Sequence, residues 1–394
     1  MKRRFSVFFI FLALTFFMSS LFLGVKHKAF ANSPINSDIF NLSSKSAILL
    51  DANSKTVVYT KNENDKRPIA SMCKIMTLLL CLEAIDRGEI NENDYITISE
   101  NASSMGGSQV FLETNAEYKV SDLIKSIVVA SANDSCVAMA EKLCGSEELF
   151  VSKMNERAKE LNMNNTCFVN CTGLPKAGQY STAKDVSTMF LELLNHNNYY
   201  NYSSIWMDKI EHPKGRCTEI SNTNKLIRFF EGCDSGKTGY TSEAGHCLVA
   251  SAKRNDMRLI SVVISSPDSK TRFREVSSMF NYGFTNYCNK IIINSSMPIN
   301  ETFTVLKGNK NTVEGIADKP LYLFTKRNEE KPIEIVIKAN EKICAPIYKG
   351  DEIGEIIVYE KGVQIASVKI VSNEEIQVKS YGNALNDIID NWAI

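Results

Sequence analysis

Ser71 and Lys74 stand three residues apart at the start of a long apolar run, PIASMCKIMTLLLCL (68–82). On a helix, residues at this spacing lie on one face, so the lysine amine can reach the serine hydroxyl. A lysine acts as a general base only after it loses its proton, which at pH 7 costs roughly 4.6 kcal/mol from an unperturbed pKa near 10.4. Burial among the apolar residues that follow would reduce this cost. The pattern predicts a serine nucleophile with a lysine base, and a plain helix cap is the alternative.

A second pair at the same spacing, Ser181 and Lys184, shows that the pattern alone is not specific. About two such pairs are expected by chance in a chain of this length and composition. We interpret Ser181 as the N-cap of a helix. Ser71 differs because both Ser131-Ala132-Asn133 and Lys237-Thr238-Gly239 follow it, whereas Ser181 is followed only by the second of these motifs.

Other candidate groups carry less chemistry. Ser99-Glu100-Asn101 is another Ser-x-Asn, but it lies in a strand-like segment too close to Ser71. No Gly-x-Ser-x-Gly and no His-Glu-x-x-His occurs, and eleven cysteines form no Cys-x-x-Cys pair. We therefore predict no metal and no cofactor, and we expect most cysteines to be buried as small apolar residues. The histidines are His27, His196, His212 and His246, and we expect His246 in a strand.

Composition and charge narrow the class of protein. The chain has 394 residues, 44% of them hydrophobic and 23% charged, which is typical of a globular protein long enough for two domains. Lysine plus arginine equals aspartate plus glutamate at 45 each. A chain without a basic excess lacks the field that neutralises many phosphates, so nucleic acid is not an expected partner.

The first 31 residues have the form of a signal peptide. Basic residues at 2–4 precede an apolar run from Phe5 to Val25, and Ala29-Phe30-Ala31 has the small-x-small form of a cleavage site. We predict export and cleavage after Ala31, and an uncleaved membrane anchor is the alternative. Either way the remaining chain is expected to work outside the cytoplasm, in the cell wall or at the outer face of the cytoplasmic membrane.

The elements that must position the motifs divide the chain into two parts. Residues 45–61 predict a β-hairpin, 72–86 a buried helix, and 121–144 two helices interrupted at 131–134. Residues 235–266 predict two strands of one antiparallel hairpin joined near 253–256. Helices between early and late strands indicate an α/β layer domain over about 38–290.

The C-terminal part has a different character. From Pro298 the sequence consists of short β runs separated by turn residues, which predicts a small all-β sandwich domain over 296–380. The tail, 381–394, places Leu385, Ile388, Ile389 and Trp392 at helical spacing, so one face is apolar. Packing on a neighbour and peripheral contact with a membrane are both left open for this tail.

The whole set of motifs resembles the low-molecular-mass penicillin-binding proteins that are serine-type D-alanyl-D-alanine carboxypeptidases. The likeness extends from about residue 38 to about 380. Besides the three motifs it includes SSMGGSQVFL (103–112), SANDSCVAMAE (131–141), FVNCTGLPKAGQYSTAKD (168–185) and KTGYTSEAGHCLVASA (237–252). The resemblance implies an α+β, penicillin-binding and serine β-lactamase-like domain in which helices flank an antiparallel sheet, followed by the β-rich domain.

The resemblance also implies catalytic roles. Ser71 would attack the carbonyl between the two terminal D-alanines of a peptidoglycan stem peptide and form an acyl-enzyme, with Lys74 as the base. Ser131 would relay a proton to the leaving amine. Asn133 would hold Lys74 and the substrate amide. β-Lactam antibiotics would be covalent inhibitors of the same serine.

Binding roles follow in the same way. Lys237 and Thr238 would meet the substrate carboxylate, and Lys237 would help to keep Lys74 neutral. Gly239 would let the strand lie close to the substrate. The backbone N–H groups of Ser71 and Tyr240 would form the oxyanion hole. Arg274 matches an arginine that binds the carboxylate in relatives, with a solvated helix charge as the alternative.

Several positions depart from the family pattern or leave its details open. Cys73 replaces a threonine, and we expect it to pack away from the cleft, with a redox-sensitive thiol as the alternative. Thr223 stands where some relatives have an arginine, which puts part of a subsite in doubt. His246 replaces an aromatic residue or asparagine. Residues 104–109 are either a lid over the cleft or a plain surface turn.

Two rival functions share parts of the evidence. A serine β-lactamase has the same three motifs, but it needs a placed glutamate and water to hydrolyse its acyl-enzyme, and no Glu-x-x-Leu-Asn occurs at a suitable place. A catalytically silent wall-binding or scaffolding protein would need a defect that the intact motifs do not show.

Overall fold

The computed structural model describes residues 39–295 and 297–382. The predicted signal peptide (1–31) and most of the predicted tail (383–394) lie outside the described residues. By their contacts, residues 39–295 and 320–331 form one compact unit, and 297–319 with 332–382 form another. The stretch 320–331, which the sequence places within the β-rich domain, thus groups with the first unit.

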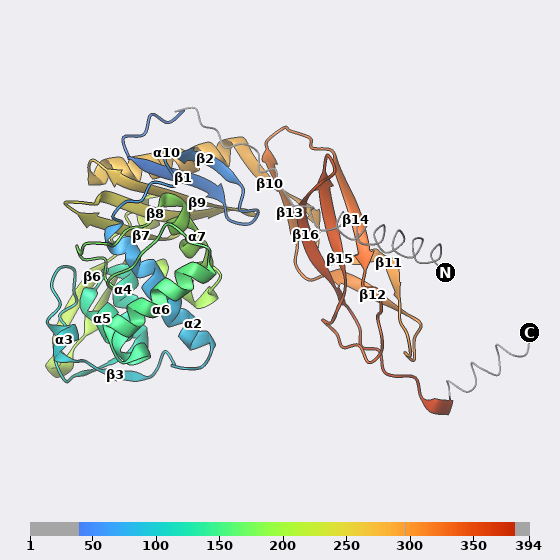
Figure 1. The fold of residues 1–394 in the computed structure, drawn as a ribbon, viewed down its shortest axis with the longest axis horizontal. Helices are drawn as coiled ribbons and strands as arrows, with labels where there is room; N and C mark the ends of the chain where they lie inside the picture. The colour runs from blue at the N-terminus through green and yellow to red at the C-terminus, as the bar shows by residue number, and fades with distance from the viewer. Residues whose placement is uncertain (1–38, 296, 383–394) are drawn as a thin grey trace, which may run out of the picture. The chain divides into compact units, whose positions relative to one another are not determined.

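A five-stranded antiparallel sheet in the order β2-β1-β9-β8-β7 forms the centre of the first unit (Figure 1). Its strands are β1 (Ser46–Asp51), β2 (Val57–Lys61), β7 (Cys233–Thr241), β8 (Gly245–Arg254) and β9 (Met257–Ser266). The hairpin expected at 45–61 is confirmed as β1 and β2. The Asp51 carboxylate accepts a hydrogen bond from the Ser54 N–H at 2.8 Å, which closes the turn between them.

The block 235–266 contains three strands, so the expectation of one two-stranded hairpin is wrong. The turn near 253–256 is confirmed between β8 and β9. A second turn separates β7 from β8, because the Thr241 hydroxyl accepts a hydrogen bond from the Ala244 N–H and Gly245 adopts a φ of +66°. The segment carrying Lys237 is therefore a strand of its own, at the edge of the sheet.

Both faces of this sheet are buried, because alternate residues of its strands pack into different clusters. On β1, Ile48 and Leu50 belong to the same core cluster as α2 (Lys74–Asp86), whereas Ala47 and Leu49 belong to the cluster that includes α10 (Ser269–Asn286). Helix α2 is buried on nearly all sides, as its uninterrupted apolar sequence predicts. A 3₁₀ turn, η1 (Ala70–Cys73), precedes it.

The longer helices of the first unit, apart from α10, lie around α2 (Figure 1). The two helices expected across 121–144 are confirmed, and their interruption is the loop 130–132. The helices are α3 (Glu100–Ser103), α4 (Val120–Val129), α5 (Asn133–Cys144), α6 (Glu147–Glu160), α7 (Ala183–Leu193), η2 (Asn197–Tyr199), α8 (Tyr200–Ser203), η3 (Pro213–Gly215) and α9 (Leu226–Phe229). Three short sheets complete the unit: β3 (Tyr95–Thr97) with β4 (Glu117–Lys119), β5 (Met207–Glu211) with β6 (Cys217–Ser221), and β10 (Tyr287–Ile293) with β13 (Leu321–Lys326).

The second unit is all-β. Its five-stranded antiparallel sheet has the order β11-β12-β16-β15-β14. The strands are β11 (Pro298–Thr304), β12 (Thr312–Ala317), β14 (Ile333–Ala339), β15 (Glu352–Glu360) and β16 (Val363–Ser372). The predicted fold class, an α/β domain with an antiparallel sheet plus a β-rich C-terminal domain, is confirmed. In the described part of the chain, no helix is both long and apolar enough to span a membrane.

Candidate active site

Ser71 lies in a tight turn between two glycines from distant segments. Ala70 before it adopts a φ of +48°, and Ser71 is the second residue of the 3₁₀ turn η1, which leads into α2. A Cβ atom at Gly173 would lie 2.9 Å from the Ser71 nitrogen and 2.1 Å from the Ala70 carbonyl oxygen. A Cβ atom at Gly239 would lie 3.2 Å from the same nitrogen. Both glycines are thus required by close approach of backbone to the Ser71 turn.

Lys74 is fully buried beneath this turn. Its Nζ donates hydrogen bonds to Ser71 Oγ at 3.2 Å and to the Thr172 carbonyl oxygen at 2.5 Å. Burial lowers the pKa of Lys74 below the ordinary value for a lysine, because the charged form loses its hydration. The side chain can therefore lose its proton more easily than a lysine in water, and the Ser71 proton is within its reach.

Lys237 joins the second and third motifs. Its Nζ donates to Ser131 Oγ at 2.8 Å and to the Thr238 carbonyl oxygen at 3.1 Å, and the residue is only 1% exposed. Burial and then the charge of Lys74 lower the pKa of Lys237 well below its ordinary range. Ser131 has a φ of +64° in the loop between α4 and α5, a conformation that costs backbone energy for a residue with a side chain. Strain of this kind is common at functional sites.

Asn133 opens α5 and contacts the loop 104–109. Its side-chain amide donates to the Gly106 carbonyl oxygen at 2.7 Å, and its backbone N–H donates to the Ser108 carbonyl oxygen at 2.7 Å. The next residue, Asp134, accepts hydrogen bonds from the backbone of Val110 and Leu112. The helix start therefore holds this loop in place, while the expected contact of Asn133 with Lys74 stays a prediction.

The arginine that contacts the Lys237 strand is Arg272, which the sequence analysis missed. Its Nη1 donates to the carbonyl oxygens of Gly239 at 3.0 Å and Cys247 at 3.2 Å. Burial lowers the pKa of Arg272, and its Nε is buried without a hydrogen-bond partner among the described residues. Arg274, the predicted residue, donates to Thr271 Oγ1 at 3.3 Å. Helical spacing in the sequence could have indicated Arg272, because it shares the buried face of α10 with Val276 and Met279.

The loop around Asn170 is a second feature that the sequence analysis did not use. Asn170 Oδ1 accepts a hydrogen bond from the Gly173 N–H at 2.7 Å, and its Nδ2 donates to the Leu174 carbonyl oxygen at 2.9 Å. This side chain shapes the turn that points the Thr172 carbonyl at Lys74. The segment 168–185 was part of the family resemblance, but no spacing rule connects it with Lys74.

The residues that depart from the family pattern are placed as follows. Cys73 is confirmed as buried packing, with Sγ donating to the Asn170 carbonyl oxygen at 3.2 Å, and burial raises the pKa of its thiol. His246 is confirmed as a strand residue in β8, and its ring stacks on Tyr240 with centroids 4.3 Å apart. The Thr223 N–H donates to the Val129 carbonyl oxygen at 3.2 Å.

The two alternative motifs have ordinary structural roles. Ser181 is buried and its hydroxyl pairs with Thr166 at 2.7 Å, while Lys184 is exposed. The N-cap of α7 is Thr182, so the interpretation of Ser181 as the cap is wrong by one residue. Ser99 caps α3 by accepting from the Ala102 N–H at 2.9 Å, so its segment begins a helix instead of being strand-like.

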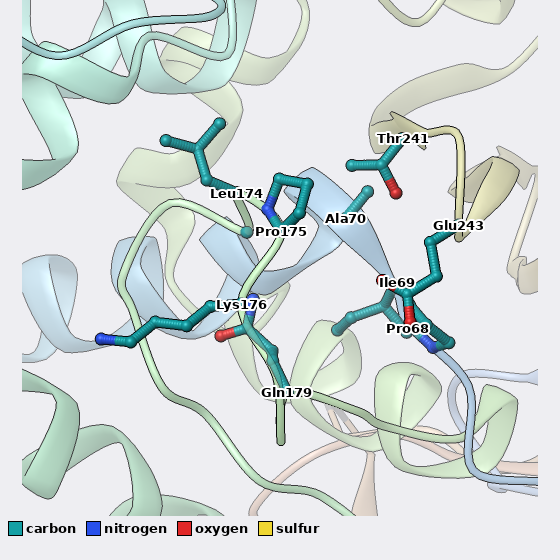
Figure 2. Close-up of a pocket in the computed structure, with 10 residues that line it drawn as sticks. Pro68, Ile69, Ala70, Leu174, Pro175, Lys176, Gln179, Thr241 and Glu243 are labelled. Carbon is teal, nitrogen blue, oxygen red and sulfur yellow. The ribbon is translucent and has the colours of Figure 1, made fainter.

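An open hollow lies beside Ala70, the residue before Ser71 (Figure 2). Three segments line it: residues 68–70, residues 173–176 with 179, and residues 241 and 243. The Lys176 side chain extends away from the other lining residues in Figure 2. In the described ranges 39–295 and 297–382, no group of three or more His, Cys, Asp and Glu side chains could hold a metal ion.

Comparison with known families gives two matches. A model for D-alanyl-D-alanine carboxypeptidases matches residues 30–268, and a model for the C-terminal domain of penicillin-binding protein 5 matches residues 292–378. Together these matches cover nearly all of the described chain.

Individual relatives agree with the family models. The chain is 38% identical to D-alanyl-D-alanine carboxypeptidase DacF of Bacillus subtilis over 88% of this chain and 90% of that one. It is 30% identical to DacA of Escherichia coli K12 over 96% and 94%. The structure of penicillin-binding protein 5 from Haemophilus influenzae is 28% identical with a TM-score of 0.68, covering 85% of this chain and 98% of that one. Penicillin-binding protein D2 from Listeria monocytogenes, in its ampicillin-bound form, is 28% identical with a TM-score of 0.56, covering 62% and 99%.

Proposed function

The chain belongs to the S11 family of serine-type D-alanyl-D-alanine carboxypeptidases, and from this premise we propose that Ser71 is the nucleophile that removes the terminal D-alanine from peptidoglycan stem pentapeptides. The observation that carries the proposal is the pairing of Ser71 with a buried Lys74 at 3.2 Å. Lys237 donates a hydrogen bond to Ser131, and Gly239, two residues along the same strand, lies against the Ser71 turn. This arrangement supports the same assignment.

Acylation begins with proton transfer from Ser71 Oγ to Lys74 Nζ. The alkoxide attacks the carbonyl carbon between the two D-alanines, and a tetrahedral intermediate forms. The backbone N–H groups of Ser71 and Tyr240 stabilise its oxyanion. The close approach of Gly239 to the Ser71 nitrogen supports this pairing, because it places β7, which carries Tyr240, beside the Ser71 turn.

Collapse of the intermediate breaks the C–N bond and releases D-alanine. Lys74 returns the proton to the leaving amine through Ser131, whose hydroxyl is already bonded to Lys237 at 2.8 Å. Lys237 and Thr238 bind the carboxylate of the leaving residue. Arg272 takes the supporting role first expected of Arg274, because it is the arginine bonded to the Gly239 carbonyl. Asn133 binds the substrate amide, and water then hydrolyses the Ser71 ester.

The same geometry supports covalent inhibition by β-lactams. A β-lactam carbonyl would occupy the position of the scissile carbonyl and leave a slowly hydrolysed ester on Ser71. The basic residues at 2–4 and the apolar run that follows support export of the chain to the cell wall or the outer face of the cytoplasmic membrane.

The test is a pair of assays on the exported form of the chain. We expect release of D-alanine from a pentapeptide ending in D-Ala-D-Ala, and stable labelling by fluorescent penicillin. Rapid turnover of penicillin would favour a serine β-lactamase instead. Absence of both label and D-alanine release from folded protein would favour a silent wall-binding protein.

The rate of acylation by penicillin is expected to rise with pH, because only unprotonated Lys74 can accept the Ser71 proton. Since burial lowers the pKa of Lys74, the rise should come well below the pH of about 10.4 at which an ordinary lysine titrates. The measurement is the second-order labelling rate across roughly pH 5 to 10. His246→Phe is the control, because burial also lowers the pKa of this histidine beside Tyr240. A rise that disappears in His246→Phe would assign the profile to the histidine.

A further inference from the structure

The order of residues along β7 sets the direction in which a substrate peptide lies. Under the proposed function, Lys237 and Thr238 bind the terminal carboxylate and Tyr240 faces the scissile carbonyl. The residues on the amino side of the scissile bond must then continue past Tyr240, toward Thr241 and Glu243. Since β7 is an edge strand, an extended peptide can lie along it.

The open hollow beside Ser71 lies at this end of β7. Ala70 and Gly173 line the side next to the nucleophile. Thr241 and Glu243 line the side that continues from the strand (Figure 2). The hollow is therefore placed to receive a side chain from just upstream of the cleaved bond.

The charge at the hollow comes from Glu243. This residue is exposed, and no ion pair involves it among the described residues 39–295 and 297–382. The other charged residue that lines the hollow, Lys176, extends away from it (Figure 2). A carboxylate at the rim of a hollow whose other charged side chain extends away from it favours a cationic side chain.

We propose that this hollow binds the side chain of the third stem-peptide residue, and that Glu243 pairs with its ammonium group. The distances are compatible, because Glu243 stands three residues beyond Tyr240, at most about 11 Å along an extended chain. One step upstream of the scissile residue is about 3.8 Å, and a four-carbon side chain with its amine covers most of the rest. The assignment rests on the proposed function. It predicts that the enzyme prefers stem peptides whose third residue carries an ammonium group.

The test uses two pentapeptides that end in D-Ala-D-Ala and carry either lysine or Nε-acetyl-lysine at the third position. Acetylation removes the charge and leaves the length of the side chain. We expect kcat/KM of the wild type to be about 1.5- to fivefold higher for the free amine, the range of an exposed ion pair. Glu243→Gln should bring the ratio of the two substrates to about one, and Glu243→Lys should bring it below one.

Glu231→Gln is the matched control, because Glu231 is an exposed carboxylate just before the other end of β7. It should keep the wild-type ratio. A wild-type ratio of one, or a ratio unchanged in Glu243→Gln, would overturn the subsite while D-alanine release continued. Loss of D-alanine release from both peptides by the wild type would instead contradict the proposed function.

Discussion

Ser71→Ala is expected to abolish penicillin labelling and to lower carboxypeptidase activity by roughly 10⁴-fold or more, because no other group can form the acyl-enzyme. The fold should survive. Ser71 is half-buried, and alanine removes one hydrogen bond from Lys74 while the bond to the Thr172 carbonyl remains. The free energy of unfolding, measured by thermal denaturation, should therefore change by only about 1 kcal/mol. Labelling with fluorescent penicillin and D-alanine release measure the effect.

Ser181→Ala is the matched control for this change. Ser181 begins a motif of the same spacing, but its hydroxyl pairs with Thr166 and Lys184 is exposed. We expect this variant to lose some stability and to keep its activity per folded molecule. If labelling persisted in Ser71→Ala and vanished in folded Ser181→Ala, the nucleophile would be Ser181 instead of Ser71.

Sequence reasoning reached the residues whose chemistry depends on local spacing. Ser71 and Lys74 are one turn apart, so a helical rule suffices to place the amine near the hydroxyl. The break at Ser131 was visible as a polar cluster between two apolar segments, and it is the loop between α4 and α5. Features of this kind follow from short stretches of chain.

The parts that sequence reasoning missed depend on contacts between distant segments. Nothing local indicates that Asn170 shapes a turn whose carbonyl accepts from Lys74, nor that Gly173 lies against Ala70. The resemblance to relatives pointed to Arg274, whereas the guanidinium that reaches the Gly239 carbonyl is that of Arg272, on the buried face of α10. Tertiary packing determines these choices, and the sequence shows it only indirectly.

Lys74→Met is expected to lower the acylation rate by roughly 10²- to 10⁴-fold, the range for loss of a general base. Methionine has a similar length and fits the apolar surroundings of α2. The variant leaves the Thr172 carbonyl without its present partner, which costs about 1 to 3 kcal/mol. The same change also removes a buried amine whose charged form is disfavoured. The rate of penicillin labelling measures the loss of the general base. The loss of the buried amine appears in the pH dependence of stability.

The sign of that pH dependence follows from proton binding. Because the pKa of Lys74 is lower in the folded chain than the value near 10.4 in the unfolded chain, the unfolded chain binds more protons between the two values. Wild-type stability should therefore rise with pH in this interval, by up to about 1.4 kcal/mol per pH unit more than that of Lys74→Met. Lys237 is present in both proteins, so the difference isolates Lys74 together with its repulsion from Lys237. Urea unfolding of both proteins at several pH values measures it, and parallel curves would mean that Lys74 remains protonated when folded and cannot serve as the base.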